Sequence, residues 1–416
     1  MEPQARRLVP ALWMLFVLRA QAGSAQAPGR WERFSAYAVI AGIHVDPAPG
    51  GRGAGQLTVV EPLGMLEAGA LRGHLVLHAA LDFEGLTMPD GVLGIGDWGE
   101  GFDDRRHPHT YAHELMLSGV NLLGSASRPL NLSLSAGKGF VPFGSDDPMN
   151  RPALRFPVNH HWSQILERAV TIAGVRAGPV VAEGALFNGD EPERPGQWPR
   201  IGGRFGDSWS LRLTVTPMTG LDLEGSHAKV HSPENRPGAA TDQEKWHASA
   251  RLDRGVGAGR LYALGEWART TEADGFFRFD SQLAEAEWSA GAHRVYYQFE
   301  RTERPEEERT LDPFRSLRPH LENSILGTTR WSVHTAGYGV RFTLLEKRIR
   351  IEPLLEASYA RVADVGGGIF STESFYGRRD FWSLTAALRL GAGTMHRMGR
   401  YGVAAATDAM GMMDRR

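Results

Sequence analysis

No cysteine occurs among the 416 residues of the chain. This absence excludes a disulfide framework, a thiolate metal site and a cysteine nucleophile. Basic residues are not in excess, since 46 Lys and Arg stand against 48 Asp and Glu, so we expect no nucleic-acid partner. No run of the sequence reaches the roughly 18 consecutive apolar residues that a membrane helix needs. The sequence therefore favours neither a nucleic-acid binder nor a helical membrane protein.

The N-terminus has the composition of an export signal. Arg6 and Arg7 precede the apolar run Leu8–Leu18, and small residues follow at 20–22 and again at 25–27. This order of basic, apolar and A-x-A segments is typical of a secretory signal peptide. We expect residues 1–27 to be the signal, with cleavage near Gly23 or Pro28, and the alternative is a short buried helix or a membrane anchor.

Alternation with a period of two runs through the rest of the chain, as expected of strands whose two faces meet different environments. Between 208 and 215, for example, Trp209, Leu211 and Leu213 alternate with serine, arginine and threonine. Similar stretches recur around residues 75, 132, 250, 297, 355 and 386. No comparable helical pattern competes, so the sequence predicts an all-β fold.

The lengths of strands and connections separate a membrane barrel from a soluble sandwich or propeller. Candidate strands of about 10 to 14 residues suit a tilted membrane crossing better than a globular sheet. Short turns, such as 177–179 and 254–258, alternate with long polar segments, such as 86–106 and 138–158. Aromatic residues near strand ends predict girdles at the two membrane interfaces. The aromatic residues are Tyr111, Trp209, Trp267, Trp331 and Trp382.

We therefore predict a transmembrane antiparallel up-and-down β-barrel of about 16 strands over residues 28–393, with long extracellular loops and short periplasmic turns. Residues 394–416 are expected to form a C-terminal tail or a final strand. One of the long segments 86–106 and 138–158 is expected to fold into the barrel mouth. The predicted location is the outer membrane of a Gram-negative-type bacterium.

Several motifs resemble those of an uncharacterised family of predicted bacterial outer-membrane β-barrels that are porin-like. They run in consistent order over about residues 70–255, and the stretch 148–157 departs from the pattern. The resemblance implies the location and the barrel fold, and it implies no activity. The motifs lie at Asp104–His109, His113–Leu117, Asn159–Trp162, Phe187–Glu193, Asp207–Arg212 and Ser232–Glu234.

Charged residues of both signs fall on the predicted inner face, where they would line a pore and filter solutes by charge and size. The alternative is that they pair with one another across a plugged lumen. The candidate pore-lining residues are Arg72, Asp82, Glu84, Arg212, Asp222, Glu224, Arg251, Arg294, Glu300, Arg348, Arg350, Glu352, Glu356 and Arg389.

Histidines gather in two short stretches and form a candidate metal site. His107, His109 and His113 lie close together in the sequence, and His160 and His161 are adjacent. Imidazoles two residues apart on a strand can reach a common metal ion, although a partner strand is needed to complete the coordination. The alternative is a solvated loop in which these histidines make structural hydrogen bonds.

The predicted function is passive diffusion of small polar solutes or ions through the lumen, without an enzymatic step and without a cofactor. A metal- or substrate-specific transporter is the nearest alternative. A hydrolase at the barrel rim is more distant, because no G-x-S-x-G motif accompanies Ser118 or Ser163. Expected partners are outer-membrane lipid and the solutes. The oligomeric state stays open, with a homotrimer as one alternative.

Overall fold

The structure is a computed structural model. It describes residues 30–47, 54–88, 91–96, 109–124, 130–145, 147–192, 195–233, 241–307, 325–345, 348–366 and 368–405. The strands are β1 (Trp31–Asp46), β2 (Gly55–Ala70), β3 (Leu75–Asp82), β4 (Ala112–Gly119), β5 (Leu130–Gly139), β6 (Arg168–Ala177), β7 (Val180–Phe187), β8 (Ser208–Met218), β9 (Leu221–Val230), β10 (Gln243–Val256), β11 (Gly259–Glu272), β12 (Phe277–Ala290), β13 (His293–Glu307), β14 (Ile325–Val340), β15 (Phe342–Leu344), β16 (Ile349–Gly366) and β17 (Asp380–Ala392). The short helices are η1 (Leu71–Gly73), α2 (Glu84–Thr87), η2 (Pro148–Asn150), α3 (His160–Ser163), η3 (Ala273–Gly275) and α4 (Thr372–Tyr376).

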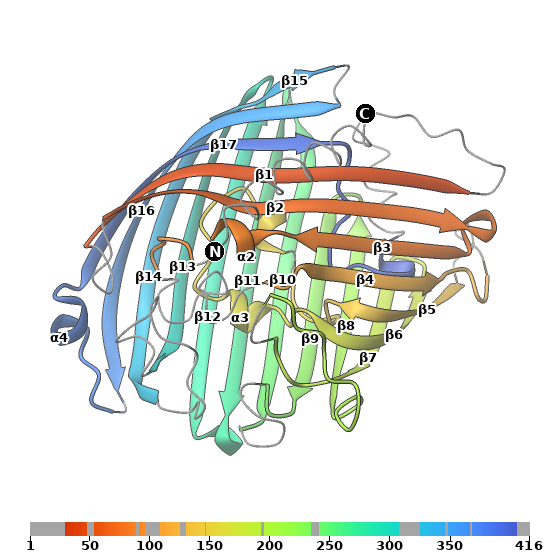
Figure 1. Ribbon diagram of the computed structural model, residues 1–416, viewed down its shortest axis with the longest axis horizontal. Helices are drawn as coiled ribbons and strands as arrows, with labels where there is room; N and C mark the ends of the chain where they lie inside the picture. The colour runs from red at the N-terminus through yellow and green to blue at the C-terminus, as the bar shows by residue number, and fades with distance from the viewer. Residues whose placement is uncertain are drawn as a thin grey trace.

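All strands belong to one antiparallel sheet that closes on itself (Figure 1). Closure comes from β1 and β17, which pair from Ala36 opposite Ala392 to Asp46 opposite Trp382. Only Arg341 separates β14 from β15, and both pair with β16, so they form one interrupted crossing. The 17 strands therefore make sixteen crossings, which confirms the predicted architecture. Closure leaves no unpaired edge, which a structure surrounded by lipid requires.

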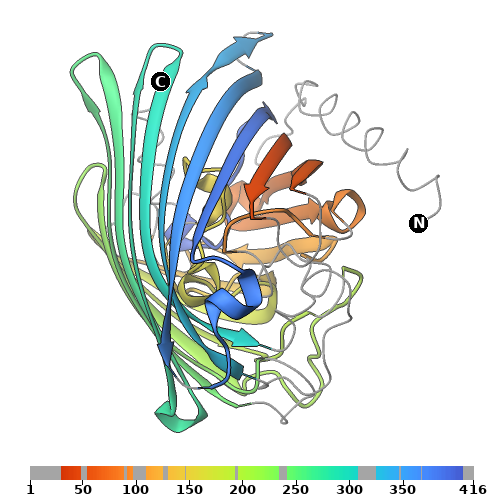
Figure 2. The same ribbon diagram turned by 90° about the vertical axis from the view of Figure 1, so that its left-hand side faces the viewer.

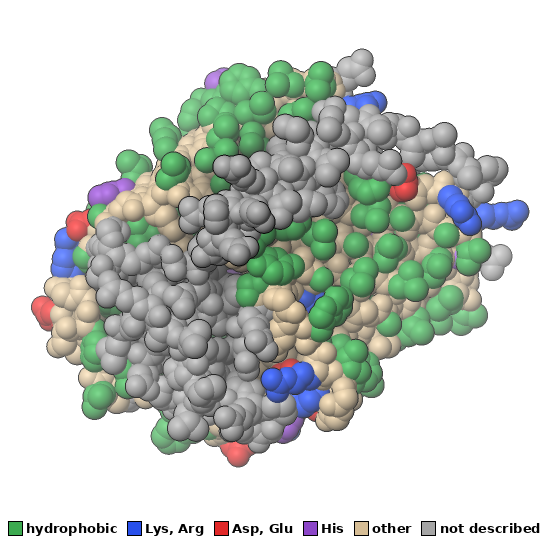
Figure 3. Space-filling view, viewed as in Figure 1, with side chains coloured by type: hydrophobic (Ala, Val, Ile, Leu, Met, Phe, Trp, Pro, Cys, Tyr) green, Lys and Arg blue, Asp and Glu red, His purple; other side chains and the backbone are tan. Residues whose placement is uncertain are grey.

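Alternation along the strands sorts apolar side chains to the outside. In β8, Trp209, Leu211 and Leu213 are exposed, whereas Ser210 and Arg212 between them are buried. Figure 3 shows hydrophobic side chains spread over the visible face of the barrel, with charged groups gathered mainly toward its margins. An apolar outer wall is what a barrel needs in contact with acyl chains. The prediction that Trp331 belongs to an aromatic girdle is wrong, because its side chain points inward and is fully buried.

Short turns join the strands at one end of the barrel. Two residues separate β6 from β7, β8 from β9, β10 from β11 and β12 from β13. Gly178, Gly257 and Gly291 have a positive φ in three of these turns, which side chains other than glycine rarely adopt. At the other end the connections are mostly longer, apart from the short η3 turn between β11 and β12, and the exception at the short-turn end is the connection 120–129 between β4 and β5. In outer-membrane barrels long loops usually face the cell exterior, and we call this end of the barrel the long-loop end.

The connection between β5 and β6, residues 140–167, folds into the barrel and contains η2 and α3. Figure 2 shows this yellow segment between the long strands β10 to β17 and the orange strands of the opposite wall. Its Met149 and Phe156 pack with Tyr37 and Leu63 of the wall in one apolar cluster. Of the two segments expected in the mouth, 138–158 is thus confirmed. Residues 91–96 of the other are also buried inside, while 97–106 lie outside the described residues.

Residues 393–405, which follow β17, also return into the barrel and add no strand. They begin at the short-turn end, where β17 finishes. Tyr401 packs in a buried cluster with Met116 and Phe187, and the backbone N–H of Val403 donates to Ser133 Oγ. The described part of the C-terminal region is therefore an internal segment.

Within the part of the chain that the structure describes, no helix is both long and apolar enough to cross a membrane.

Candidate functional site

The inserted loop 140–167 is fastened to the opposite wall by buried charges. Arg151 lies 3.0 Å from Glu266 of β11, and Arg155 lies 2.8 Å from Glu300 of β13, measured from guanidinium nitrogen to carboxylate oxygen. Glu300 also accepts the backbone N–H groups of Val158 and Asn159, at 2.9 and 2.6 Å. Buried charges persist only where such partners compensate for their lost hydration. These contacts form a latch between the loop and the wall, called the loop latch below.

A third carboxylate of the wall takes part in the loop latch. Glu356 of β16 accepts the backbone N–H groups of Leu154 and Arg155 at 2.7 and 3.1 Å. Glu300 and Glu356 are 0% and 3% exposed, whereas the walls of a wide water-filled lumen would be wet. The loop therefore covers the middle of the lumen on this side.

The structure distributes the predicted pore-lining residues among three environments. Those that are buried and on the inner face of strands are Asp82, Arg212, Glu224, Arg294, Glu300, Glu352 and Glu356. Asp222, Arg251 and Arg389 are partly buried, and Glu84 is buried in α2 beyond the end of β3. Arg72, Arg348 and Arg350 are exposed at the short-turn end, with Arg72 in η1. Whether these residues line a path for solutes stays a prediction.

Most of the buried inward charges are paired. Arg212 meets Glu183 at 2.7 Å, and Arg294 pairs with Glu352. Glu224 pairs with Arg400 of the C-terminal segment at 2.5 Å. Sequence reasoning left open that these charges pair with one another, and the described residues show such pairs.

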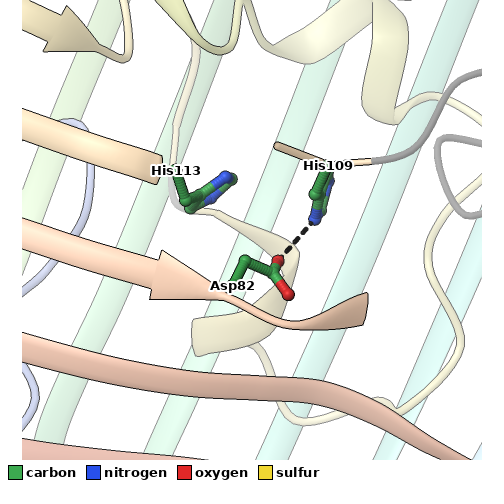
Figure 4. Close-up of side chains that lie close together, drawn as sticks. All are labelled: Asp82, His109 and His113. Atoms are coloured by element: carbon green, nitrogen blue, oxygen red, sulfur yellow. Dashed lines mark hydrogen bonds and ion pairs between the residues drawn. The ribbon is translucent and has the colours of Figure 1, made fainter. Parts of the chain in front are cut away.

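A compact cluster of histidines and acids lies where β3 ends and β4 begins, at the long-loop end. One ligand atom each from Asp82, His109 and His113 can be chosen so that all three lie within 4.8 Å of one another. Figure 4 shows the three side chains converging, with a hydrogen bond between His109 and Asp82. His109 Nδ1 lies 3.0 Å from Asp82 Oδ2 and 2.9 Å from Glu84 Oε2. We call Asp82, His109 and His113 the histidine site.

The histidine site is supported from the start of β6. Glu167 accepts from His113 Nδ1 at 2.7 Å and from the backbone N–H of Thr110 at 3.0 Å. Lys138 Nζ donates to the same carboxylate at 3.0 Å. A carboxylate on one ring nitrogen fixes the ring and presents the other nitrogen as a ligand. His113 Nε2 is buried and has no hydrogen-bond partner among the described residues.

The pKa values of the ionisable groups at and around the histidine site are shifted by burial and by these contacts. Burial alone would lower the pKa of His109, but the carboxylates of Glu84 and Asp82 outweigh it and hold the pKa well above its usual value. Burial raises the pKa of Glu84, and the neighbouring Asp82 charge adds to that rise. For Glu167, His113 and Lys138 overcome the effect of burial and keep the pKa well below its ordinary value.

Two imidazoles and one carboxylate make a ligand set that suits first-row divalent metal ions and leaves further positions open. The structure thus brings together two of the predicted histidines, His109 and His113. His107 lies outside the described residues. His160 and His161 belong to α3, which packs against β11, about half-way round the barrel from β3 and β4. The five predicted histidines therefore do not form one site.

The C-terminal segment forms a further polar cluster that the sequence did not reveal. His396 hydrogen-bonds Glu114 and stacks on His78, with ring centroids 4.9 Å apart. Burial alone would lower the pKa of His396, but Glu114 raises it above the ordinary value. Arg400 adds hydrogen bonds to Glu224 and Thr214. No motif marks these residues, and their partners are more than 170 positions away in the sequence.

Comparison with solved structures finds barrels of the same kind. OmpT (in-vitro folded), an outer membrane protein of Vibrio cholerae, has a TM-score of 0.50 and 10% identity over 90% of this chain and 100% of that one. An anion-selective porin from Comamonas acidovorans has a TM-score of 0.50 and 12% identity over 87% and 99%. No protein-family model matches the chain, and no curated protein matches it.

At such identities the likeness concerns the fold. It agrees with the closed sheet, the apolar outer wall and the polar interior described above. The chain is accordingly a closed antiparallel β-barrel of sixteen crossings with a porin-like fold.

Proposed function

We propose that this outer-membrane barrel is a channel for passive diffusion of small polar solutes or ions, narrowed by the loop 140–167. The observation that carries the proposal is the loop latch. In it the charged loop crosses the lumen and forms ion pairs with Glu266 and Glu300 of the far wall. Mixed inward charges provide transverse fields that sort solutes by charge and size. The proposal includes no catalysed reaction and no cofactor.

The buried latch implies a narrow and selective path. Glu266, Glu300 and Glu356 are covered by the loop, so solutes reach that part of the lumen only when the loop shifts. We therefore expect small unitary currents rather than the large steady currents of a wide general pore. The solutes themselves are small enough to pass beside residues 140–167.

The test is the single-channel current of the purified, folded protein in planar bilayers, with reversal potentials measured in a salt gradient. Stepwise currents with a defined ion preference would support the channel. A protein that is folded and inserted, yet silent at all voltages, would contradict it. Heat-modifiable migration on a gel and circular dichroism establish folding before the measurement.

Transport of a divalent transition-metal ion is the second candidate function, favoured by His113 Nε2 of the histidine site, which is buried and has no hydrogen-bond partner in the part of the chain that the structure describes. Titration calorimetry with Zn²⁺ or Ni²⁺ measures binding to the wild type and to His113→Ala. The matched control is His334→Ala, because His334 is exposed on the outer face of β14. Loss of binding in His113→Ala alone would support a metal site. Equal binding by both variants would contradict it.

A homotrimer remains part of the proposal, together with contact with outer-membrane lipid. Analytical ultracentrifugation in detergent measures the mass of the assembly. A single species at three times the mass of one chain would agree with the trimer, and a monomer at all protein concentrations would contradict it.

A further inference from the structure

The outer face of β11 to β14 carries arginines at the long-loop end. Arg269, Arg278, Arg301 and Arg330 lie around one surface groove of about 280 Å³, and we call them the arginine patch. They point outward because their strand neighbours point inward and are buried. These neighbours are Ala268, Thr270, Phe279, Thr302, Thr329 and Trp331.

The strand register fixes the height of the arginine patch on the barrel. Gln282 of β12 stands opposite both Trp267 and Arg301, so those three form one outward row. The next row toward the short-turn end includes Phe299 and Tyr359, both paired with His334 of β14. Still nearer the short-turn end, the outward positions are apolar, as at Ala286 and Tyr297.

The arginine patch therefore borders the aromatic girdle, at the level where lipid headgroups lie. It does not stand on a loop that projects into water. The long-loop end faces the cell exterior, so the adjoining lipids are those of the outer leaflet.

Two acids hold the guanidinium groups in place without neutralising them all. Asp280 contacts Arg269 at 2.7 Å and Arg278 at 3.1 Å, and Glu303 contacts Arg330 at 2.5 Å. Arg301 is exposed and has no ion-pair partner among the described residues. Four arginines against these two acids leave an excess of two positive charges around the groove.

Such a surface fits a phosphate group. Guanidinium presents a planar fork of donors that matches two phosphate oxygens, and it pairs well at an interface because it is only weakly hydrated. Trp267 lies beneath Arg269, with the guanidinium 5.3 Å from the ring centroid, which stiffens that arginine. Charges near a membrane surface also feel less screening than they would in water.

We propose that the arginine patch binds the phosphorylated headgroup of an outer-leaflet lipid. Arg301 and Arg278 supply the charges that the acids neutralise least, and Arg269 and Arg330 flank them. The ligand is a lipid of the surrounding membrane, so this site is independent of the lumen and of solute passage.

The experiment uses the full, folded protein in detergent and measures binding of bisphosphorylated lipid A by native mass spectrometry. The double variant Arg278→Gln/Arg301→Gln removes the two least paired charges. Losing charge-assisted hydrogen bonds should weaken binding by about tenfold or more. The control is Arg254→Gln, since Arg254 is exposed near the opposite end of the neighbouring strand β10.

Four comparisons decide the proposal. Weaker binding by the double variant, wild-type binding by the control and poor binding of dephosphorylated lipid A would support it. Equal affinity for the phosphorylated and dephosphorylated lipids would overturn it, as would an unchanged affinity in the double variant. Competition by millimolar inorganic phosphate as effective as that by lipid A would overturn the lipid as ligand and assign the patch to a free anion.

Discussion

Replacing Arg155 with methionine should release the inserted loop. The guanidinium donates to Glu300, Gln298 and the backbone oxygen of Phe156, at 2.8, 3.2 and 2.7 Å. Methionine keeps much of the apolar stem and removes the charge. Glu300 is 0% exposed, so in the Arg155→Met variant it would remain as a buried carboxylate without its cation.

Removing one partner of a buried ion pair costs about 3–5 kcal/mol. Here that cost falls on the docked state of the loop, because Glu300 regains water when the loop leaves. At about 1.4 kcal/mol per factor of ten, the ratio of open to docked loop should rise by roughly 10²- to 10³-fold. We therefore expect larger and more frequent current steps, together with faster proteolysis within residues 140–167.

The control is Arg378→Met. Arg378 pairs with Asp46 at 3.0 Å, but both side chains are about half exposed, so that pair contributes at most about 1 kcal/mol. Wild-type currents and wild-type proteolysis in Arg155→Met would refute the reasoning, because they would mean that the buried pair does not hold the loop.

Three further predictions concern the loop, the outer wall and the C-terminal segment. Gly144→Ala should loosen the loop and speed its proteolysis, because Gly144 has φ +75° and an added Cβ would lie 1.6 Å from the backbone oxygen of Ser163. The control is Gly265→Ala, which should leave cleavage unchanged because there is open space around Gly265. Leu211→Arg places a charge on the exposed apolar face and should lower the free energy of unfolding by up to about 2–4 kcal/mol in urea titrations. The same change at Leu123, beyond β4 at the short-turn end, should have little effect, and equal losses at both positions would contradict the assigned membrane face. Because the pKa of His396 is raised in the folded protein, its contribution to docking is present below about pH 6.5 and is lost as pH rises through the folded pKa. Protease protection of residues 393–405 should accordingly fall between neutral and alkaline pH in the wild type but not in His396→Phe, and pH-independent protection in both would count against this pairing.

The barrel is the part of the fold that the sequence predicts well. Alternation assigns an outside and an inside over long strands, as at Trp209 and Arg212, because lipid and a polar interior select opposite residue types. The rule fails where an aromatic residue fills the interior. Trp331 is flanked by outward polar residues, Arg330 and Ser332, and packs inside the barrel against Phe381.

The contacts inside the lumen were not predictable. The sequence suggested that residues 138–158 enter the mouth, but the partner Glu266 of Arg151 is 115 positions away. At the histidine site, the proximity of His109 and His113 follows from their spacing. Asp82 and Glu167 join them because β3, β4 and β6 lie close together in the sheet, and this strand order cannot be read from sequence spacing.

The path of residues 393–405 also bears on the order of assembly. Arg400, Tyr401 and Val403 contact residues of β4, β5, β8 and β9, none of which neighbours β17 in the sheet. This segment can find all its partners only after the wall has curled round and β1 has met β17. Its docking should therefore be a late event in biogenesis, and its burial distinguishes a sealed barrel from an open sheet that has all its strands but has not yet closed.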